Sequence, residues 1–206
     1  MRGLLLISGG LDSPVAGWIM NKQMELYSVH FSGEPFVNKE AENKANALAK
    51  IAGCKRFLVV PFGKIQEDIT NHCEHRLYYI ITKRLMLMIA EKLAQKYNCD
   101  YLITGDSLGQ VGSQTLSNLT NITRAAKMEV LRPLLSYDKN ETIELAKKIG
   151  TYELSTGPEM CSLLGPKHPA TKSSIENLEK EESRLKIDAL IKNALENTKE
   201  ELIGEK

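Results

Sequence analysis

Residues 3–13 read Gly-Leu-Leu-Leu-Ile-Ser-Gly-Gly-Leu-Asp-Ser, an apolar run that stops at a serine and two glycines. The apolar part, residues 3–7, predicts a buried strand, and Ser8-Gly9-Gly10 predicts a tight loop directly after it. From Asp12 to Gln23 the apolar residues recur at helical spacing, which indicates a helix behind the loop. The chain therefore opens with a strand, a loop and a helix, as α/β proteins do.

The same alternation continues along most of the chain. Further apolar runs predict strands at 26–31, 56–61, 101–104 and 128–131, and helical periodicity predicts helices at 38–52, 77–97, 112–126 and 138–148. Strands that alternate with helices favour a parallel sheet that is covered on both faces. The predicted fold class is therefore α/β, with a three-layer, doubly wound, five-stranded parallel sheet.

The segment from Thr171 onward differs from the rest. Its apolar residues indicate one long amphipathic helix, which could pack on the domain, pair with another chain or fray. We therefore expect one domain over residues 1–170, followed by a C-terminal amphipathic helical extension over residues 171–206.

The composition narrows the class of protein. Hydrophobic residues make up 42% and charged residues 26% of the 206 residues, which argues against disordered and fibrous proteins. No apolar stretch approaches the roughly 20 residues of a membrane span, so we expect a cytoplasmic protein without membrane contact. The formal net charge of +1 gives no global attraction to nucleic acid, so RNA contacts must come from a local patch or another chain.

The four cysteines, Cys54, Cys73, Cys99 and Cys161, include no Cys-x-x-C pair. This spacing argues against a structural zinc site, and the cytosol would keep the thiols reduced. Each cysteine taken singly is expected to be a small buried hydrophobic residue.

The loop of residues 8–13 has the features of an anion site. Its glycines allow backbone N–H groups to approach an anion closely, its serines add donors, and the following helix N-terminus adds a positive dipole. In an open α/β sheet, ligands bind outside the carboxyl ends of the strands, where this loop should lie. The loop lacks the ending of a Walker A motif and the Gly-x-Gly-x-x-Gly pattern of dinucleotide-binding proteins. The alternative is a plain strand-to-helix turn.

The 8–13 loop resembles the PP-loop of ATP pyrophosphatases, which split ATP between the α and β phosphates and activate a carbonyl oxygen as an adenylate. Further motifs resemble those of the tRNA 4-thiouridine synthetases, the ThiI family, over about residues 4–172. The largest is the block at 105–116, Gly-Asp-Ser-Leu-Gly-Gln-Val-Gly-Ser-Gln-Thr-Leu, and the others lie at 13–17, 30–31, 83–86, 132–134 and 149–152. The resemblance implies an adenine nucleotide alpha hydrolase-like, Rossmann-like fold.

The resemblance also implies which residues bind ATP with its Mg²⁺. They are the end of the first strand, the loop, and single positions on later elements: Leu6, Ile7, Ser8, Gly9, Gly10, Asp12, Ser13, His30, Phe31, Lys83, Gly105 and Gln114. Asp12 would act in catalysis near the metal or the reacting phosphate. His30 and Phe31 would face adenine, and Lys83 would face the phosphates. From the residues alone, His30 could instead be a core histidine, Lys83 a solvated helix lysine and Gln114 a polar residue at a helix start.

Cys161 is the second catalytic residue that the resemblance implies, because family members place a cysteine there beside the adenylated uridine. A thiol can attack the persulfide of a sulfur donor or assist the release of sulfur as a disulfide forms. The alternative is a structural thiol. Some members use a cysteine cluster with an iron–sulfur centre, which here would need Cys54, Cys73 or Cys99 to converge on Cys161, with Cys73 as the first candidate.

The implied function is ATP-dependent sulfur transfer to a tRNA uridine, near position 8, that yields 4-thiouridine with a sulfide or persulfide donor. A role in thiamine thiazole synthesis and a homodimer are left open. The family's THUMP and rhodanese domains have no counterpart in the sequence, so we expect a separate THUMP-type chain to bind tRNA. The chain alone would offer the local basic residues Lys83, Arg84, Arg124 and Lys127. The alternatives are another PP-loop adenylating enzyme, acting on a small molecule or nucleobase, and a non-catalytic ATP-binding subunit.

Overall fold

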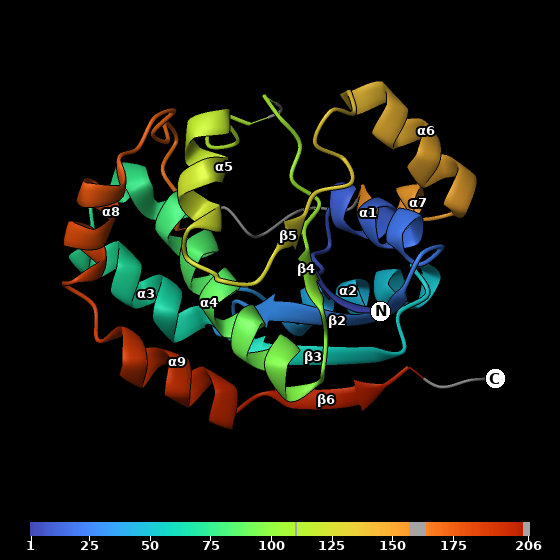
Figure 1. Ribbon diagram of the computed structural model, residues 1–206, viewed down its shortest axis with the longest axis horizontal. Helices are drawn as coiled ribbons and strands as arrows, with labels where there is room; N and C mark the ends of the chain where they lie inside the picture. Colours follow the sequence, from blue (N-terminus) through green and yellow to red (C-terminus); the bar gives the residue numbers. More distant parts are fainter. Residues whose placement is uncertain (110, 157–163, 204–206) are drawn as a thin grey trace.

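The computed structural model describes residues 1–109, 111–156 and 164–203. Its centre is a six-stranded sheet in the order β5-β4-β1-β2-β3-β6 (Figure 1). Five strands run parallel, and β6 pairs with β3 in the antiparallel sense. The strands span Arg2–Leu6 (β1), Glu25–Ser32 (β2), Arg56–Pro61 (β3), Tyr101–Ile103 (β4), Val130–Leu131 (β5) and Lys199–Leu202 (β6).

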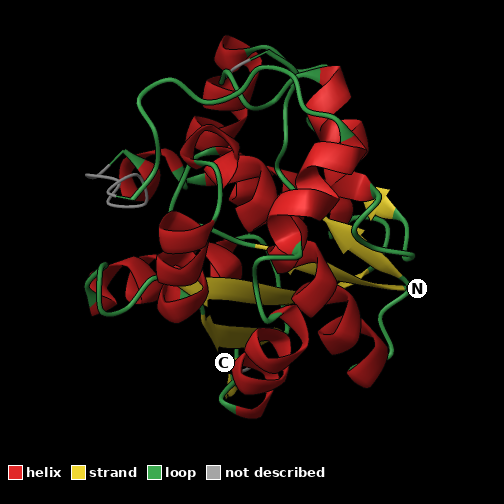
Figure 2. Cartoon of the chain, turned by 90° about the vertical axis from the view of Figure 1, so that its left-hand side faces the viewer, coloured by secondary structure: helices red, strands yellow, loops and turns green. Residues whose placement is uncertain are grey.

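Helices cover both faces of the sheet (Figures 1 and 2). One face carries α1 (Asp12–Met20), α2 (Lys39–Ile51) and α6 (Lys139–Ile149). The other face carries α3 (Gly63–His72), α4 (Tyr78–Lys96), α5 (Leu116–Thr123), α8 (Ile175–Glu182) and α9 (Ile187–Glu196). Two short helices complete the described part, η1 (His75–Leu77) and α7 (Tyr152–Ser155). Successive strand residues feed opposite cores, since Leu4 packs on the α4 side and Leu5 on the α1 side.

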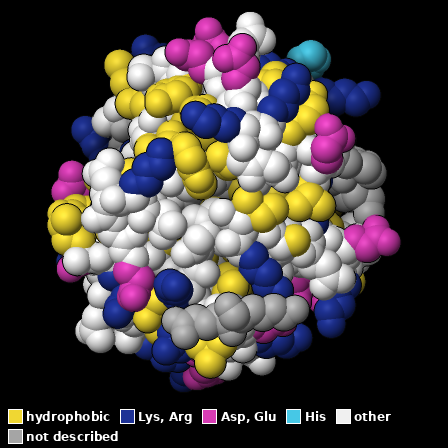
Figure 3. Space-filling model, turned by 90° about the vertical axis from the view of Figure 1, so that its right-hand side faces the viewer, with side chains coloured by type: hydrophobic (Ala, Val, Ile, Leu, Met, Phe, Trp, Pro, Cys, Tyr) yellow, Lys and Arg dark blue, Asp and Glu magenta, His cyan; other side chains and the backbone are white. Residues whose placement is uncertain are grey.

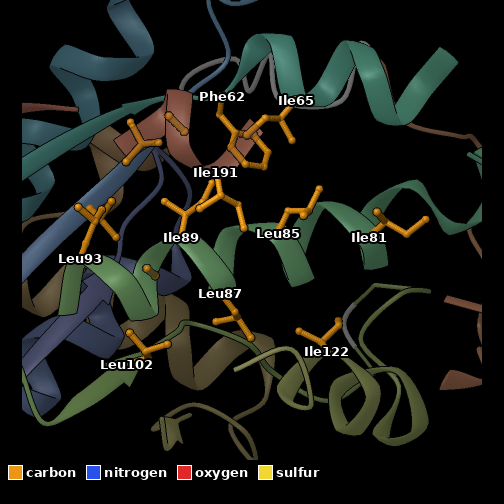
Figure 4. Close-up of a cluster of buried hydrophobic side chains, with 14 of the residues drawn as sticks. Phe62, Ile65, Ile81, Leu85, Leu87, Ile89, Leu93, Leu102, Ile122 and Ile191 are labelled. Atoms are coloured by element: carbon orange, nitrogen blue, oxygen red, sulfur yellow. The ribbon is translucent and has the colours of Figure 1, made fainter. Parts of the chain in front are cut away.

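The larger of the two cores surrounds α4. In Figure 4, Leu85 and Ile89 of this helix lie near Phe62, at the start of α3, and Ile191 of α9. The helix contacts α3, α5 and α9 as well as the sheet, which explains why it is apolar around most of its circumference. Neither α4 nor another helix in the described ranges has both the length and the apolar content for a bilayer crossing.

The predicted α/β class and the five parallel strands are confirmed. The sequence analysis did not predict α3 or the sixth strand. All four residues of β6, Lys-Glu-Glu-Leu, are exposed, so they lack the apolar pattern of a buried strand. Backbone pairing with β3 and an ion pair between Arg56 and Glu200 hold β6 at the edge of the sheet.

The tail is helical, as expected, but it forms two helices and a strand instead of one long helix. Residues 183–186 separate α8 from α9. Leu178 of α8 and Ile191 of α9 are both buried in the core around α4. The break between the helices lets both side chains reach this core.

A buried ion pair joins the tail to α4. Arg84 and Glu182 are only 3% and 6% exposed, and both carboxylate oxygens of Glu182 accept from the guanidinium, one at 2.9 Å from Nη2. Arg84 also donates from Nη1 to the carbonyl of Asn121 at 2.6 Å. The expectation that Arg84 is available to RNA is therefore wrong, because Arg84 is an internal anchor for α8.

Removing the carboxylate from this pair should destabilise the chain. We expect Glu182→Ala to lower the free energy of unfolding by about 3–5 kcal/mol, since it leaves the Arg84 charge buried without its partner. Urea unfolding followed by circular dichroism measures the loss. Glu179→Ala, an exposed glutamate on the same helix, is the matched control and should change the value by less than about 0.5 kcal/mol. Equal effects of the two substitutions would contradict the anchoring role.

Candidate nucleotide-binding site

The sheet topology places the 8–13 loop at the switch point of the fold. β1 lies between β2 and β4, so the connections after β1 and β4 leave toward opposite faces of the sheet. A ligand crevice forms at such a point, outside the carboxyl ends of the strands. The loop joins β1 to α1, which begins at Asp12. The 8–13 loop therefore lies where proteins of this fold class bind their ligands.

The serines of the loop close it on itself. Ser13 Oγ accepts from the backbone N–H of Ser8 at 2.9 Å, and Ser8 Oγ accepts from the backbone N–H of Gly10 at 3.2 Å. The two hydroxyl oxygens are 3.2 Å apart. These bonds hold the curved backbone of the loop in shape, which lowers the cost of ordering it around an anion.

Two residues outside the loop, Lys44 and Ser155, contact it and were not predicted from the sequence. A Cβ on Gly9 would lie 3.1 Å from Cδ of Lys44 on α2, so the lysine stem occupies the space beside this glycine. The Lys44 ammonium donates to the carbonyl of Ser155 at 3.2 Å, and Ser155 Oγ donates to the carbonyl of Gly10 at 3.4 Å. The sequence carries no local signal for either contact, because α2 and α7 are distant from the loop along the chain.

Gly105 brings the end of β4 against the start of α1. A Cβ at this position would lie 2.7 Å from the backbone nitrogen of Ser13 and 2.8 Å from the carbonyl carbon of Asp12. Backbone atoms cannot move aside as a flexible side chain can. Gly105, Asp12 and Ser13, all predicted site residues, are thus brought together, and glycine is needed for this backbone approach.

The predicted adenine-side residues lie at the carboxyl end of β2. His30 is 6% exposed, its Nδ1 lies 3.2 Å from the carbonyl oxygen of Ile7, and its ring stacks on Phe57 with centroids 6.2 Å apart. Burial lowers the pKa of His30, while the bond to Ile7 opposes this shift. The neutral ring therefore donates from Nδ1 and holds the end of β1. Phe31 packs edge-on against Phe62 with centroids 5.2 Å apart.

Leu6 and Ile7 are the predicted site residues at the end of β1. Their side chains pack on opposite faces of the sheet. Ile7 is 3% exposed and lies in the core on the α1 side. Leu6 is partly buried and packs against the core around α4. The strand end is therefore held by apolar packing on both faces.

A buried carboxylate next to Gly105 forms ion pairs with two basic side chains. Asp106 is 6% exposed; its Oδ1 pairs with Lys83 of α4, and its Oδ2 accepts from Nε of Arg132 at 3.2 Å. Thr104 Oγ1 donates to the same Oδ2 at 2.8 Å. Burial raises the pKa of the Asp106 carboxyl, but the two cations and the hydrogen bonds outweigh this effect and lower the pKa below its usual value. Lys83 is thus not simply a solvated helix lysine.

Gln114 organises the connection between β4 and α5. Its side-chain Oε1 accepts from the backbone N–H of Ser107 at 3.4 Å, and its carbonyl accepts from Gly109 at 3.0 Å. Gly109 adopts φ of +76°, which glycine reaches without strain. Gln114 lies directly before Thr115, the N-cap residue of α5. The predicted residue therefore shapes the loop that follows Asp106.

The predicted catalytic cysteine, Cys161, lies outside the described residues. The other three cysteines are buried, and burial raises the pKa of the Cys54 thiol to about 12 and those of Cys73 and Cys99 to about 11. These thiols are protonated near neutral pH and are therefore poor nucleophiles. Within residues 1–109, 111–156 and 164–203, no three His, Cys, Asp or Glu side chains gather into a group that could hold a metal. Cys54, Cys73 and Cys99 thus form no ligand group for an iron–sulfur cluster among themselves.

The doubly wound sheet and the Ser-Gly-Gly-Leu-Asp-Ser loop at its switch point define an α/β protein of the PP-loop class. The family model described as Thiamine biosynthesis protein (ThiI) matches residues 1–187, and the chain belongs to this family.

Relatives with curated names agree with this assignment. The chain is 43% identical over 203 residues to a probable tRNA sulfurtransferase of Moorella thermoacetica, covering 95% of the chain and 52% of the relative. It is 42% identical over 204 residues to a probable tRNA sulfurtransferase of Acetivibrio thermocellus, covering 96% and 52%. The chain therefore spans about half the length of the curated relatives it matches.

Solved structures share the fold. A crystal structure of a 4-thiouridine synthetase–RNA complex with bound ATP has a TM-score of 0.93 and 37% identity, covering 98% of this chain and 55% of that chain. The U34-tRNA thiolase NcsA from Methanococcus maripaludis, with its 4Fe-4S cluster, has a TM-score of 0.54 and 17% identity, covering 96% and 72%. The second likeness shows the fold alone.

Adding one methyl group at Gly105 should disturb the contact between β4 and α1. We expect Gly105→Ala to lower the free energy of unfolding by about 1–3 kcal/mol, because its Cβ would overlap backbone atoms. Gly112→Ala is the matched control, since its Cβ would meet Pro169 Cγ at 3.5 Å, an ordinary contact. Urea unfolding of both variants tests this, and wild-type stability in Gly105→Ala would disprove the tight approach.

The Asp106 carboxylate should give the chain a pH-dependent part of its stability. Its pKa is lower in the folded chain than its usual value of 3.8, so this contribution is complete well above 3.8 and is lost as the pH falls through the folded pKa. Asp106→Asn should therefore cost about 3 kcal/mol of unfolding free energy near pH 6 and progressively less below about pH 4. Urea unfolding at several pH values measures the difference from wild type. Glu144→Gln, an exposed site on α6, should show almost no difference throughout.

Proposed function

We propose that the chain is the ATP-dependent, adenylating part of a tRNA sulfurtransferase that makes 4-thiouridine. The observation that carries the proposal is the self-closed 8–13 loop at the switch point, with Lys83 and Asp106 beside it. The likeness to a 4-thiouridine synthetase with bound ATP and RNA supports this choice of reaction. A cytoplasmic location fits a tRNA substrate.

The first step of the proposed reaction is adenylation. O4 of a tRNA uridine, near position 8, attacks the α phosphorus of ATP, the bond to the β phosphate breaks, and pyrophosphate leaves. Backbone N–H groups of the loop and the Lys83 ammonium stabilise the charge that develops on the phosphates. Mg²⁺ is assigned to the phosphates as part of the substrate, with the Asp12 carboxylate as the acidic group of the loop.

The second step is sulfur transfer. The terminal sulfur of a donor persulfide attacks C4 of the adenylated uridine, and AMP leaves with the former O4. The Cys161 thiolate then attacks the donor sulfur of the S–S bond, which leaves the terminal sulfur on C4 as thiouridine and joins Cys161 to the donor as a disulfide. With free sulfide, the sulfur attacks C4 directly and no S–S bond has to be broken. We assign Cys161 to this step, because the buried thiols of Cys54, Cys73 and Cys99 remain protonated near neutral pH. No step is assigned to an iron–sulfur cluster. Sulfur supply for thiamine thiazole synthesis is a second proposed use of the same chemistry.

Recognition of tRNA is proposed to need a THUMP-type RNA-binding chain or region. Of the four local basic residues, Arg84 is buried in its pair with Glu182 and Lys83 pairs with Asp106, whereas Arg124 and Lys127 are exposed. On the face that Figure 3 shows, Lys and Arg side chains are interspersed with apolar and acidic ones. These observations favour weak tRNA binding by this chain alone. A homodimer remains a prediction.

Two substitutions should separate the two steps. We expect Asp12→Asn to lose both tRNA-dependent pyrophosphate release and thiolation, because the carboxylate charge is removed beside the phosphates. Cys161→Ser should keep pyrophosphate release but lose thiolation, since a hydroxyl hardly ionises near neutral pH and exchanges no sulfur. The assay follows pyrophosphate and the thiouridine content of tRNA, with a THUMP-type protein and a protein persulfide donor present.

Two controls accompany this assay. One is a substitution of a different cysteine, and the other compares tRNA with small molecules as the acceptor. Cys54→Ala removes a buried thiol with no assigned role and should thiolate at the wild-type rate once its folding is verified. Normal thiolation by Cys161→Ser would show that Cys161 is only a structural thiol. Pyrophosphate release that is stimulated by a small molecule and not by tRNA would indicate a different PP-loop enzyme. ATP binding without turnover would indicate a non-catalytic subunit.

A further inference from the structure

Two cations share one carboxylate beside the 8–13 loop. Lys83 pairs with Oδ1 of Asp106, and Arg132 pairs with Oδ2. The three side chains are all largely buried, with 30%, 11% and 7% of the Lys83, Arg132 and Asp106 side chains exposed. The group therefore carries a net charge of +1 in a place of low solvent access, which favours a further negative charge nearby.

Arg132 uses only part of its hydrogen-bonding capacity. Its Nε donates to Asp106, but its Nη2 is buried and has no hydrogen-bond partner within the described part of the chain. A guanidinium that served only to neutralise Asp106 would bind the carboxylate through two nitrogens, as Arg84 binds Glu182. At Asp106 the second oxygen is already taken by Lys83. The buried Nη2 of Arg132 is thus left for another acceptor.

The register of the strands places this group beside the loop. Arg132 follows directly after β5, and the backbone N–H of Thr104 donates to the carbonyl of Leu131 at 3.0 Å, which aligns the ends of β4 and β5. Asp106 follows Gly105, where a Cβ would overlap the backbone of Asp12 and Ser13. The ends of β5, β4 and β1 therefore stand in a row, with the cationic group next to the loop.

We infer that Arg132 contacts the phosphate chain of the bound nucleotide through Nη2, and that Asp106 is a positioning residue that holds Arg132 and Lys83 toward it. This inference rests on the proposed function. Lysine and arginine offer donors and no acceptors, so they match phosphate oxygens better than the mixed donors and acceptors of a base. The sequence motif at 132–134 otherwise has no role in the site.

The test is calorimetry on the full chain with three probes in a magnesium buffer. The probes are a non-hydrolysable ATP analogue, inorganic pyrophosphate and adenosine. We expect Arg132→Ala to weaken binding of the analogue and of pyrophosphate at least tenfold and to leave adenosine binding within twofold of wild type. Arg132→Lys keeps a charge near Asp106 but lacks the planar donor, so it should show a smaller loss at normal thermal stability. Lys192→Ala, which removes an exposed charge on α9, should bind all three probes as wild type does.

Three results would overturn the inference. One is pyrophosphate binding by folded Arg132→Ala or Arg132→Lys that equals wild type. Another is an equal loss of adenosine and pyrophosphate binding, which would mean that Arg132 only supports the structure. The third is a wild-type chain that binds neither phosphate probe. If the wild type binds both and the Arg132 variants lose them while tRNA is not thiolated, the proposed function fails and the phosphate contact stands.

Discussion

The backbone at the end of β4 touches the backbone at the start of α1, and the candidate site depends on this contact. A Cβ at Gly105 would lie 2.7 Å from the backbone nitrogen of Ser13, so no side chain fits between the two chain segments. The contact brings the connection after β4 beside the 8–13 loop. It thereby places Asp106, with its two cations, next to the turn that the serines close. A wider separation of the strand ends would divide the site into two unconnected halves.

Much of this arrangement could be predicted from local sequence, because local physics produces it. Apolar runs such as residues 3–7 form buried strands wherever the remaining chain can cover them, and Ser8-Gly9-Gly10 turns sharply in many contexts. The five parallel strands and the switch-point loop follow from these two signals. The strand at Lys199–Leu202 could not be predicted in this way, because the edge of β3 selects it by backbone pairing and its exposed side chains carry no pattern.

Contacts between segments that are distant along the chain could not be predicted from the sequence either. Lys44 and Ser155 support Gly9 and Gly10 from two helices, and neither residue type at its position signals such a role. Asp106 and Arg132 stood in quoted motifs, but their pairing appears only when β4 and β5 lie side by side. The formal net charge of +1 gives no sign of these ion pairs, because it counts buried and solvated charges alike.

The ion pair between Arg84 and Glu182 has a consequence for how the chain is made. The two residues are 98 positions apart, and Arg84 is the neighbour of Lys83 on α4. On the ribosome, the loop and α4 emerge well before α8. Until Glu182 arrives, the guanidinium of Arg84 has no carboxylate to meet it in the core, so α4 cannot be buried in its final orientation without a large penalty. The helix that carries Lys83 is thus completed by a residue of the late-emerging tail, so we expect α4 to take its final place only after α8 has been synthesised.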